Sequence, residues 1–533
     1  MASDNYKGKP GGIPTQVDES IPLKKTTASL SKPFALDTKY GRQILVAFLM
    51  INAVVLYNAL FHDPRIGYDT TAFIVNIDIL SEGRLPTEAE SPEFFTPPLA
   101  FLPPAALKAA LDTFVPGSLT SPPNDAWLPT FLHYRFLRSI PEFNLAVAVK
   151  FAQLLNIFYS LVLTYTLLKI GALIRPDDTR FRLHALLFLG ILPVYYKTFA
   201  FVRPEPLLAA LVLLAAYLAI KLYLFDGASP RNLVAFGVVL GLIAIARQWG
   251  FAVFPALVLF ALLLKIKASL SWRSAFQPLL VSFSIAFLVG GWFYLLLWRD
   301  YGSPLAFNRQ PSPELQLENT ALDFTGLGGG QLFRDPLYTS FRGQVIPTYY
   351  SELWGDYWHF FVVYGIEKES GIYIDGNYIN TRERNEAGLP PEQRRWHTNR
   401  FEINNYLGRV NLAALIPTGF LLAGIALAAY RLIALLRAPS PTTLDLSLAA
   451  LFLFPLLSLA AYIWFLITYT HGDPTTIKAS YTLQIFPFLA LLSAEALAEL
   501  ASRFKRLLPV SLMLLAFAAL YYLPVFFTRY NTW

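Results

Sequence analysis

The 533-residue chain contains no cysteine, and its six histidines are scattered. The absence of cysteine excludes disulfides, cysteine-ligated zinc and thiol catalysis. The histidines form no H-x-x-x-H or H-E-x-x-H pair, which argues against a zinc site. No N-x-Ser/Thr sequon occurs, so nothing indicates a loop that is glycosylated in the endoplasmic reticulum.

Charge is also scarce. Only 15% of the residues are charged, whereas a soluble globular chain has about a quarter. Hydrophobic residues make up 55% of the chain. This composition predicts a polytopic integral membrane protein. The net charge of +7 needs no nucleic-acid partner, because much of the Lys and Arg lies in short loops between apolar runs.

Apolar runs recur along the chain, and a helix needs roughly 20 such residues to cross a bilayer. The sequence predicts an all-α fold of about eleven membrane-spanning helices, of which the third and fifth are the shortest. The eleven runs lie near 43–61, 146–168, 183–200, 206–224, 232–246, 250–266, 276–298, 410–430, 446–468, 480–498 and 508–527.

Basic residues fall in six alternate loops between these runs. Since Lys and Arg are enriched in cytoplasmic loops, the agreement predicts a cytoplasmic N-terminus. Eleven spans would then place the C-terminus on the extracytoplasmic side. No internal repeat is evident, which gives no support to an inverted-repeat transporter.

The loops divide the chain into parts. Residues 1–40 are polar and rich in Pro, Gly and Lys, which predicts a disordered cytosolic tail. An N-terminal transmembrane module, 41–298, includes the long extracytoplasmic loop 62–145. Residues 299–409 form a second extracytoplasmic segment, predicted as a mixed α/β or irregular cap, and 410–533 form a C-terminal transmembrane module.

An acid opens the first long loop. Asp69 precedes a predicted helix, so one interpretation is an N-cap and another is a ligand-binding carboxylate. Asn76 lies seven residues on and falls on the same helix face, whereas Asp78 falls on the opposite face. A site with two carboxylates would therefore have to recruit another acid, such as Asp63 or Glu205.

Two short outer turns carry arginine. Arg203 and Glu205 lie in "FVRPEPLLAAL", which fits either an interfacial arginine with an acid partner or a charged site at membrane level. Arg247 lies in "IARQWGF", on the side where basic residues are rare. We therefore expect Arg247 to have a specific function, such as binding an anion.

A third cationic position lies near the C-terminus, in "YTHGDPTTIKASYTLQIFPFLALL". Lys478 stands at the outer mouth of the tenth predicted span, with His471 nearby. It fits either an interfacial anchor or a cation that binds phosphate. Together the turns offer a carboxylate and several cations on one side and at one depth. Such a site suits binding of a lipid phosphate while a carboxylate deprotonates a hydroxyl.

These stretches resemble the GT-C superfamily of membrane glycosyltransferases, in the branch of protein O-mannosyltransferases, aminoarabinose transferases and bacterial relatives. The features are an early-loop acid in "GYDTTAF", a "PPL" element in "FFTPPLAFLPP" and the charged turn "RPEPLLA". A basic residue, a Tyr and a Pro-interrupted span follow in "KASYTLQIFPFLALL", and "SELWGDYW" looks like the outer segment of bacterial members.

The resemblance implies transfer of a sugar from a polyprenyl-phosphate donor, with Asp69 as general base. It implies that Arg203, Arg247 and Lys478 bind the lipid phosphate and that Tyr481 belongs to the same site. The resemblance requires no cofactor, and a divalent metal that bridges the carboxylate and the phosphate stays an open alternative. Many members carry two adjacent acids in this loop, whereas Asp69 is followed by a threonine.

We therefore expect an extracytoplasmic glycosyltransferase in a bacterial plasma membrane, in contact with membrane lipids and an acceptor that is a protein, a lipid or a glycan. Two other classes stay open. A transporter or lipid flippase would also need outward-facing charges, and it should show charges buried within its spans. A non-catalytic scaffold subunit would use its outer segments as an interaction surface.

Overall fold

The computed structural model describes most of the apolar chain. The described residues are 33–114, 140, 142–307, 325–337, 340–341, 343–362, 367–368, 371–372, 405–438, 441–469 and 476–529. Regular structure in this part is helical, apart from an antiparallel pair of two-residue strands, β1 (Glu367–Lys368) and β2 (Gly371–Ile372). The predicted all-α fold is confirmed. Most of the predicted tail lies outside the described residues.

Eight described helices or helix pairs are long and apolar enough to cross a membrane. They are α1 (Gly41–Phe61), α5 (Phe143–Ile174), α8 (Glu205–Lys221) with η2 (Leu222–Asp226), η3 (Gln248–Ala252) with α10 (Val253–Lys267), α11 (Trp272–Tyr301), the helix ending in α16 (Leu415–Arg437), α17 (Thr443–Tyr469), and η8 (Ala479–Ile485) with α18 (Phe486–Arg503).

The other three predicted spans are helical but shorter. The third is broken into α6 (Thr179–Gly190) and α7 (Pro193–Ala200), which meet at an angle of 63°. The fifth and eleventh are α9 (Pro230–Ala244) and α19 (Leu507–Tyr521), of 15 residues each. At 1.5 Å per residue, 15 residues reach about 22 Å, short of a core of about 30 Å. The count of eleven spans is therefore not confirmed; by length it is eight, or nine with the bent pair.

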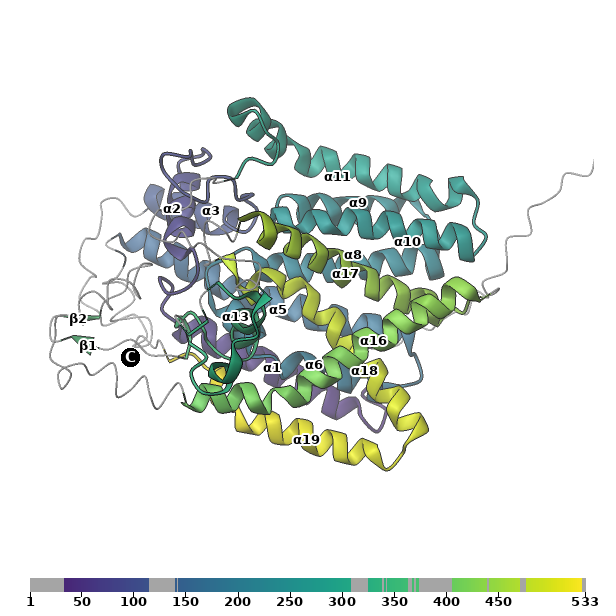
Figure 1. The fold of residues 1–533 in the computed structure, drawn as a ribbon. Helices are drawn as coiled ribbons and strands as arrows, with labels where there is room; N and C mark the ends of the chain where they lie inside the picture. Colours follow the sequence, from purple (N-terminus) through teal and green to yellow (C-terminus); the bar gives the residue numbers. More distant parts are fainter. Residues whose placement is uncertain are drawn as a thin grey trace, which may run out of the picture.

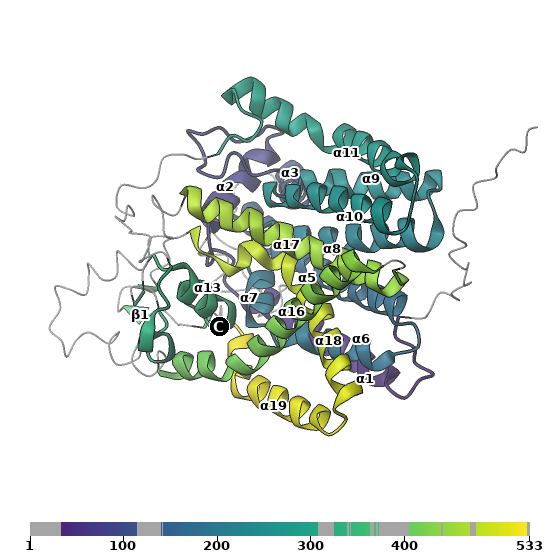
Figure 2. The ribbon, with the colours of Figure 1, turned by 45° about the vertical axis from the view of Figure 1, so that its right-hand side comes forward.

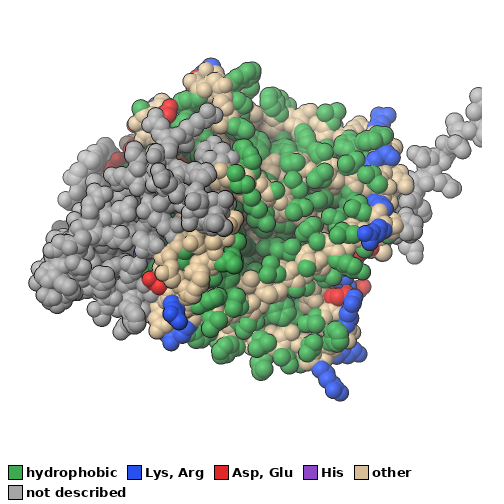
Figure 3. Space-filling model, viewed as in Figure 1, with side chains coloured by type: hydrophobic (Ala, Val, Ile, Leu, Met, Phe, Trp, Pro, Cys, Tyr) green, Lys and Arg blue, Asp and Glu red, His purple; other side chains and the backbone are tan. Residues whose placement is uncertain are grey.

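The long helices pack side by side into one body (Figures 1 and 2), with α9 and α11 along one edge and α19 along the other. Apolar side chains cover much of the described surface in Figure 3; a smaller group of Lys and Arg lies at one end, and Lys and Arg gather mainly at the other. Contacts join several basic loops there: Arg175 and Arg431 both pair with Glu495, and Lys267 donates to the carbonyl of Ala438. The predicted grouping of these loops at one end agrees with the structure.

The opposite end carries the described parts of the two long outer segments. Three short helices lie there in both ribbon views: α2 (Thr70–Ser81), α3 (Leu102–Phe114) and α13 (Val345–Trp354). Two 3₁₀ turns complete the described elements, η5 (Gly329–Phe333) and η9 (Leu523–Phe526). The body of the protein thus has a basic end and an end that is covered by these segments.

Candidate functional site

The backbone before α2 turns sharply to present Asp69. Gly67 has φ +149°, and Asp69 itself lies in the left-handed region with φ 58° and ψ 12°. A Cβ on Gly67 would lie 2.7 Å from Thr70 Oγ1 and 3.1 Å from the Phe201 ring, so only glycine fits there. Asp69 holds the N-cap position, but its carboxylate caps none of the N–H groups of α2.

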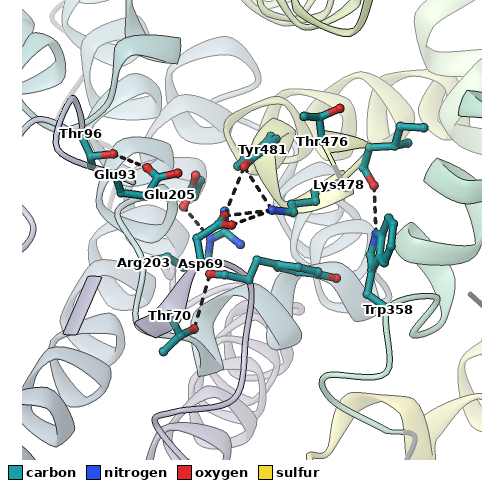
Figure 4. Close-up of polar contacts among 12 residues, drawn as sticks. Asp69, Thr70, Glu93, Thr96, Arg203, Glu205, Trp358, Thr476, Lys478 and Tyr481 are labelled. Atoms are coloured by element: carbon teal, nitrogen blue, oxygen red, sulfur yellow. Dashed lines mark hydrogen bonds and ion pairs between the residues drawn. The ribbon is translucent and has the colours of Figure 1, made fainter. Parts of the chain in front are cut away.

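The Asp69 carboxylate instead faces the loop before η8 (Figure 4). Lys478 Nζ lies 3.0 Å from Oδ1 and 2.9 Å from Oδ2, and the Tyr481 hydroxyl lies 3.3 Å from Oδ2. The Asp69 side chain is 26% exposed, whereas that of Lys478 is 5% exposed. Asp69 therefore keeps a path to solvent while its partner is enclosed.

Lys478 is held by its backbone as well as by its ammonium. The Tyr462 hydroxyl accepts from the Lys478 N–H at 3.0 Å and donates to its carbonyl at 3.2 Å. The chain then forms η8, where Thr482 departs from helical geometry, and α18 starts with Pro487 in its first turn. Proline is tolerated in that turn because its missing N–H would have no helical partner. The α-helical part of this span, α18, therefore begins only after the site residues.

Two arginines lie on the other side of Tyr481, at the starts of α8 and η3. Arg203 Nε donates to Glu205 at 2.7 Å, and Arg247 Nε lies 3.5 Å from the same carboxylate. Arg247 also donates to Glu93 at 3.0 Å and to the Thr96 hydroxyl. The side chains of Arg203 and Glu205 are fully buried, and that of Arg247 is 3% exposed.

Arg203 differs from Arg247 and Lys478 in having hydrogen-bond donors without a partner in the described part of the chain. Its Nη1 and Nη2 are buried and have no hydrogen-bond partner among the described residues. Its guanidinium lies between two aromatic faces, 5.2 Å from the ring centre of Tyr68 and 5.3 Å from that of Tyr481. Buried arginine donors are expected to be paired, so this fork points to a ligand, and its geometry suits phosphate or carboxylate.

The pKa values of the two acids near Tyr481 shift in opposite directions. Burial acts to raise the pKa of Asp69, but the charges of Lys478 and Arg203 outweigh it and hold that pKa below its ordinary value. Burial raises the pKa of Glu93, and the charge of Asp69 adds to the rise, although Arg247 opposes it. Asp69 is thus an ionised, partly exposed carboxylate at neutral pH.

The structure brings together six of the eight residues that the sequence singled out. They are Asp69, Arg203, Glu205, Arg247, Lys478 and Tyr481. Asn76 lies one step away, where its amide donates to the Glu93 carbonyl at 3.1 Å. His471 lies outside the described residues.

Two other acids of the first loop that the sequence analysis considered pair with cations outside this site. Asp63 pairs with Arg65 at 2.9 Å rather than with the cations around Asp69. Asp78 pairs with Lys108 at 3.1 Å and is 41% exposed, on the face of α2 away from the site, as its helical position predicted. Glu205 lies beside Arg203 and Arg247, and Glu93 pairs with Arg247 as well.

Sequence reasoning missed four residues around this site. Glu93 and Thr96 lie within or beside the quoted "FFTPPLAFLPP" stretch, but nothing in their spacing ties them to Arg247. Glu352 and Lys197 form a buried pair behind Tyr68. Lys197 was detectable, because an ionisable residue within an apolar run usually has a function.

The described residues contain no group of three or more His, Cys, Asp or Glu side chains arranged to hold a metal ion. The acids of the site are paired with Lys and Arg instead. This arrangement can hold an anion with its cations and can accept a proton on its exposed carboxylate.

No protein-family model matches the chain, and no curated protein matches it. Among solved structures, it is similar to the apo oligosaccharyltransferase from Archaeoglobus fulgidus, with a TM-score of 0.44 and 15% identity over 92% of this chain and 56% of that one. It is similar to AglB from the same organism in complex with an inhibitory peptide and a dolichol-phosphate, with a TM-score of 0.43, 13% identity and the same coverage.

A third similar structure is ArnT from Cupriavidus metallidurans bound to undecaprenyl phosphate, with a TM-score of 0.34 and 14% identity over 91% of this chain and 88% of that one. The chain spans about half the length of the oligosaccharyltransferase structures. These neighbours are of the kind that the sequence resemblance indicated. Because the TM-scores lie below 0.5, the likeness assigns no substrate and no residue role to this chain.

Proposed function

We propose that this protein is an integral membrane glycosyltransferase that moves a sugar from a polyprenyl-phosphate donor to a hydroxyl group of an acceptor. The observation that carries the proposal is the pairing of two features at one end of an apolar helical body. One is an ionised carboxylate that is partly exposed to solvent, Asp69; the other is a buried guanidinium with unpaired donors, Arg203.

The cations suit a lipid phosphate. A donor phosphodiester carries one negative charge, and the released lipid phosphate carries about two at neutral pH. Negative charge therefore grows on the phosphate during transfer, and fixed donors aimed at it stabilise the transition state. Arg203 offers two unpaired nitrogens and Lys478 offers an ammonium, while Arg247 is already shared by Glu93 and Glu205.

Asp69 is the proposed base. In the reaction, the acceptor oxygen bonds to the anomeric carbon, the bond from that carbon to the phosphate oxygen breaks, and the acceptor proton passes to the Asp69 carboxylate. A single displacement of this kind inverts the anomeric centre. Lys478 pairs with Asp69 here, so a bound phosphate would compete for that ammonium and release the carboxylate as the substrate arrives.

The membrane position of the site suits both substrates. The apolar body lets the lipid chain stay within the bilayer, and the solvent path to Asp69 admits an acceptor hydroxyl. We place the site on the extracytoplasmic side, with the N-terminus cytoplasmic, in a bacterial plasma membrane. The chain's own residues provide the base and the phosphate ligands, so the proposal includes no cofactor and no metal. The acceptor class is a protein, a lipid or a glycan.

The test uses purified protein in lipid with a panel of radiolabelled polyprenyl-phosphate sugars. Wild-type protein should consume at least one donor, by transfer or by slow hydrolysis. Asp69→Asn should lose about 10²- to 10⁴-fold in turnover, the usual worth of a general base. It should still bind polyprenyl phosphate, because Arg203 and Lys478 remain and Lys478 loses its competing carboxylate.

Asp78→Asn is the matched control. It removes a carboxylate from the same helix, α2, on the face that pairs with Lys108. Its turnover should be close to wild type. Wild-type turnover in Asp69→Asn would refute the base assignment. Donor binding without consumption by any protein would favour a transporter or flippase, and neither binding nor consumption would favour a scaffold subunit.

A further inference from the structure

A buried ion pair lies behind the site and takes no part in the chemistry proposed above. Lys197, near the end of α7, pairs with Glu352 on α13, and their side chains are 1% and 0% exposed. Lys197 Nζ also donates to the backbone carbonyls of Glu352, at 2.8 Å, and Gly355, at 3.1 Å. Burying two charges is costly even when they are paired, so the pair is expected to serve something beyond stability.

Tyr68 is the third member of this cluster. Its hydroxyl donates to the same Glu352 oxygen, Oε1, that Lys197 contacts. Its ring is packed edge-on against Phe201 at 5.5 Å and Phe360 at 5.0 Å. The ring and its hydroxyl are thus fixed together, from the membrane helices on one side and from the outer segment on the other.

Tyr68 reaches the site in two ways. It is the residue immediately before Asp69, at the left-handed turn that presents the carboxylate. Its ring centre also lies 5.2 Å from both the Arg203 guanidinium and Lys478 Nζ. Cations at this distance from an aromatic face are attracted to it. One side chain therefore touches both proposed phosphate ligands and adjoins the proposed base.

We infer that Tyr68 is a positioning residue for the transfer reaction, and that Glu352 and Lys197 hold its hydroxyl so that Asp69, Lys478 and Arg203 keep one geometry. The inference deepens the proposed function and rests on it. The inference also assigns a role to the outer segment that carries α13. Glu352 on α13 accepts the hydrogen bond from the Tyr68 hydroxyl and so fixes the position of the Tyr68 ring.

The groups that face Asp69 determine what a test can measure. Lys478 faces it from the loop before η8 and Tyr481 from η8 itself. Arg203 faces it from the start of α8, Arg247 from the start of η3, and Glu93 from the loop after α2. If Tyr68 loosens, Asp69 and Lys478 separate while the burial persists. The acid limb of the rate profile should then move to higher pH, because the carboxylate would hold its proton more strongly.

The experiment compares Tyr68→Phe with wild type on the donor that wild type consumes. This change removes only the hydroxyl and leaves the ring beside the cations. We expect kcat to fall about tenfold, because small misplacements of reacting groups are costly. We expect KM to change less than about twofold, because the aromatic face stays, and the acid limb of kcat/KM to move to higher pH.

Tyr196→Phe is the matched control. Tyr196 lies on α7 and, like Tyr68, is buried. Its hydroxyl donates to the Gly190 carbonyl at 2.7 Å, away from Asp69. It should lose a comparable amount of thermal stability with no shift of the acid limb. Tyr68→Leu removes the ring as well, so its KM should rise several-fold through the loss of both cation contacts.

A wild-type profile and kcat in Tyr68→Phe would overturn the inference while leaving the proposed function intact. A fall in kcat without a shift of the acid limb would overturn it too, because a merely structural role would give that result. If wild-type protein consumes no donor, the proposed function fails and the inference fails with it.

Discussion

Asp69 and Lys478 form an ion pair in this structure. A substrate phosphate, whose negative charge grows during transfer, would compete with Asp69 for the Lys478 ammonium. The ammonium contacts both carboxylate oxygens at about the same distance, 2.9 and 3.0 Å. A phosphate that approaches Arg203 brings an anion into competition for the same ammonium. At the scale of one residue, Lys478 thus serves two purposes: it keeps the base ionised before the substrate binds, and it is available to the phosphate afterwards.

Removing Lys478 should therefore change the pH dependence as well as the affinity. Lys478 is the strongest of the charges that lower the Asp69 pKa, and burial acts in the opposite direction. In Lys478→Met the pKa of Asp69 should rise. Since the base works only when ionised, the acid limb of kcat/KM should move to higher pH, and KM should rise because a phosphate ligand is lost.

The measurement is kcat/KM across pH on the donor that wild type consumes. Lys221→Met provides the control, because Lys221 forms an ion pair with Asp226 at 2.8 Å far along α8 from the site. Its profile should match wild type. An unshifted acid limb in Lys478→Met would show that Asp69 is not the group whose ionisation controls the rate.

At the scale of elements, the cations of the site lie at or just before the first residues of helices, not in helix interiors. Proline stands in the first turn of α7, α8 and α18. The chain just before α8 carries Arg203, and the chain just before η8, which leads into α18, carries Lys478. Proline fixes the start of a helix without the loss of a helical hydrogen bond. Charged residues can thus stand just outside an apolar span.

The sequence predicted these elements well for a physical reason. Apolar runs and their flanking prolines report helices and their starts directly, so every predicted run is helical. Helix length was less predictable. The run 183–200 is broken before Pro193 into α6 and α7, and in the run 508–527 helix α19 ends at Tyr521. Hydropathy measures composition, and it does not measure where the backbone turns.

The turn before α2 gives a prediction at this scale. Gly67→Ala should destabilise the protein by more than about 1 kcal/mol, because alanine is strained at positive φ and its Cβ would press on Thr70 and Phe201. Turnover should fall further than stability explains, since the turn aims Asp69. Thermal unfolding in detergent and donor consumption would be measured together.

Gly83→Ala separates the two causes. Gly83 also has positive φ, at +81°, but a Cβ there would meet nothing within 4 Å. It should show the backbone strain alone and keep turnover. Equal losses in both variants would mean that the packing around Gly67 does not matter to the site.

At the scale of the whole molecule, the site joins parts of the chain that are far apart in sequence. Asp69 and Lys478 are separated by 409 residues, Arg247 and Glu93 by 154, and Lys197 and Glu352 by 155. The alternation of the spans puts the turns beside apolar runs at the same end of the molecule. The charged residues in these turns could therefore be predicted as one group. The partners Glu93 and Glu352 could not, since each lies in a long outer segment whose path depends on packing rather than on hydropathy.

The pair of Lys197 and Glu352 gives the prediction for the whole molecule, because it fastens the outer segment to the membrane body. Lys197→Met should destabilise the protein by about 3 to 5 kcal/mol, since it leaves the Glu352 charge buried without its partner. Glu352→Gln alone should cost a similar amount by stranding the Lys197 ammonium.

The double variant, Lys197→Met with Glu352→Gln, carries neither charge of this pair, and the amide oxygen at position 352 can still accept from the Tyr68 hydroxyl. It should lie within about 1 kcal/mol of wild type, a large coupling in a double-mutant cycle, and it should keep most of its turnover. Thermal unfolding of all four proteins gives the cycle. Additive losses would mean that the two charges do not depend on each other. A stable double variant without turnover would mean instead that the ion pair itself, and not only the acceptor for Tyr68, is needed to hold the site.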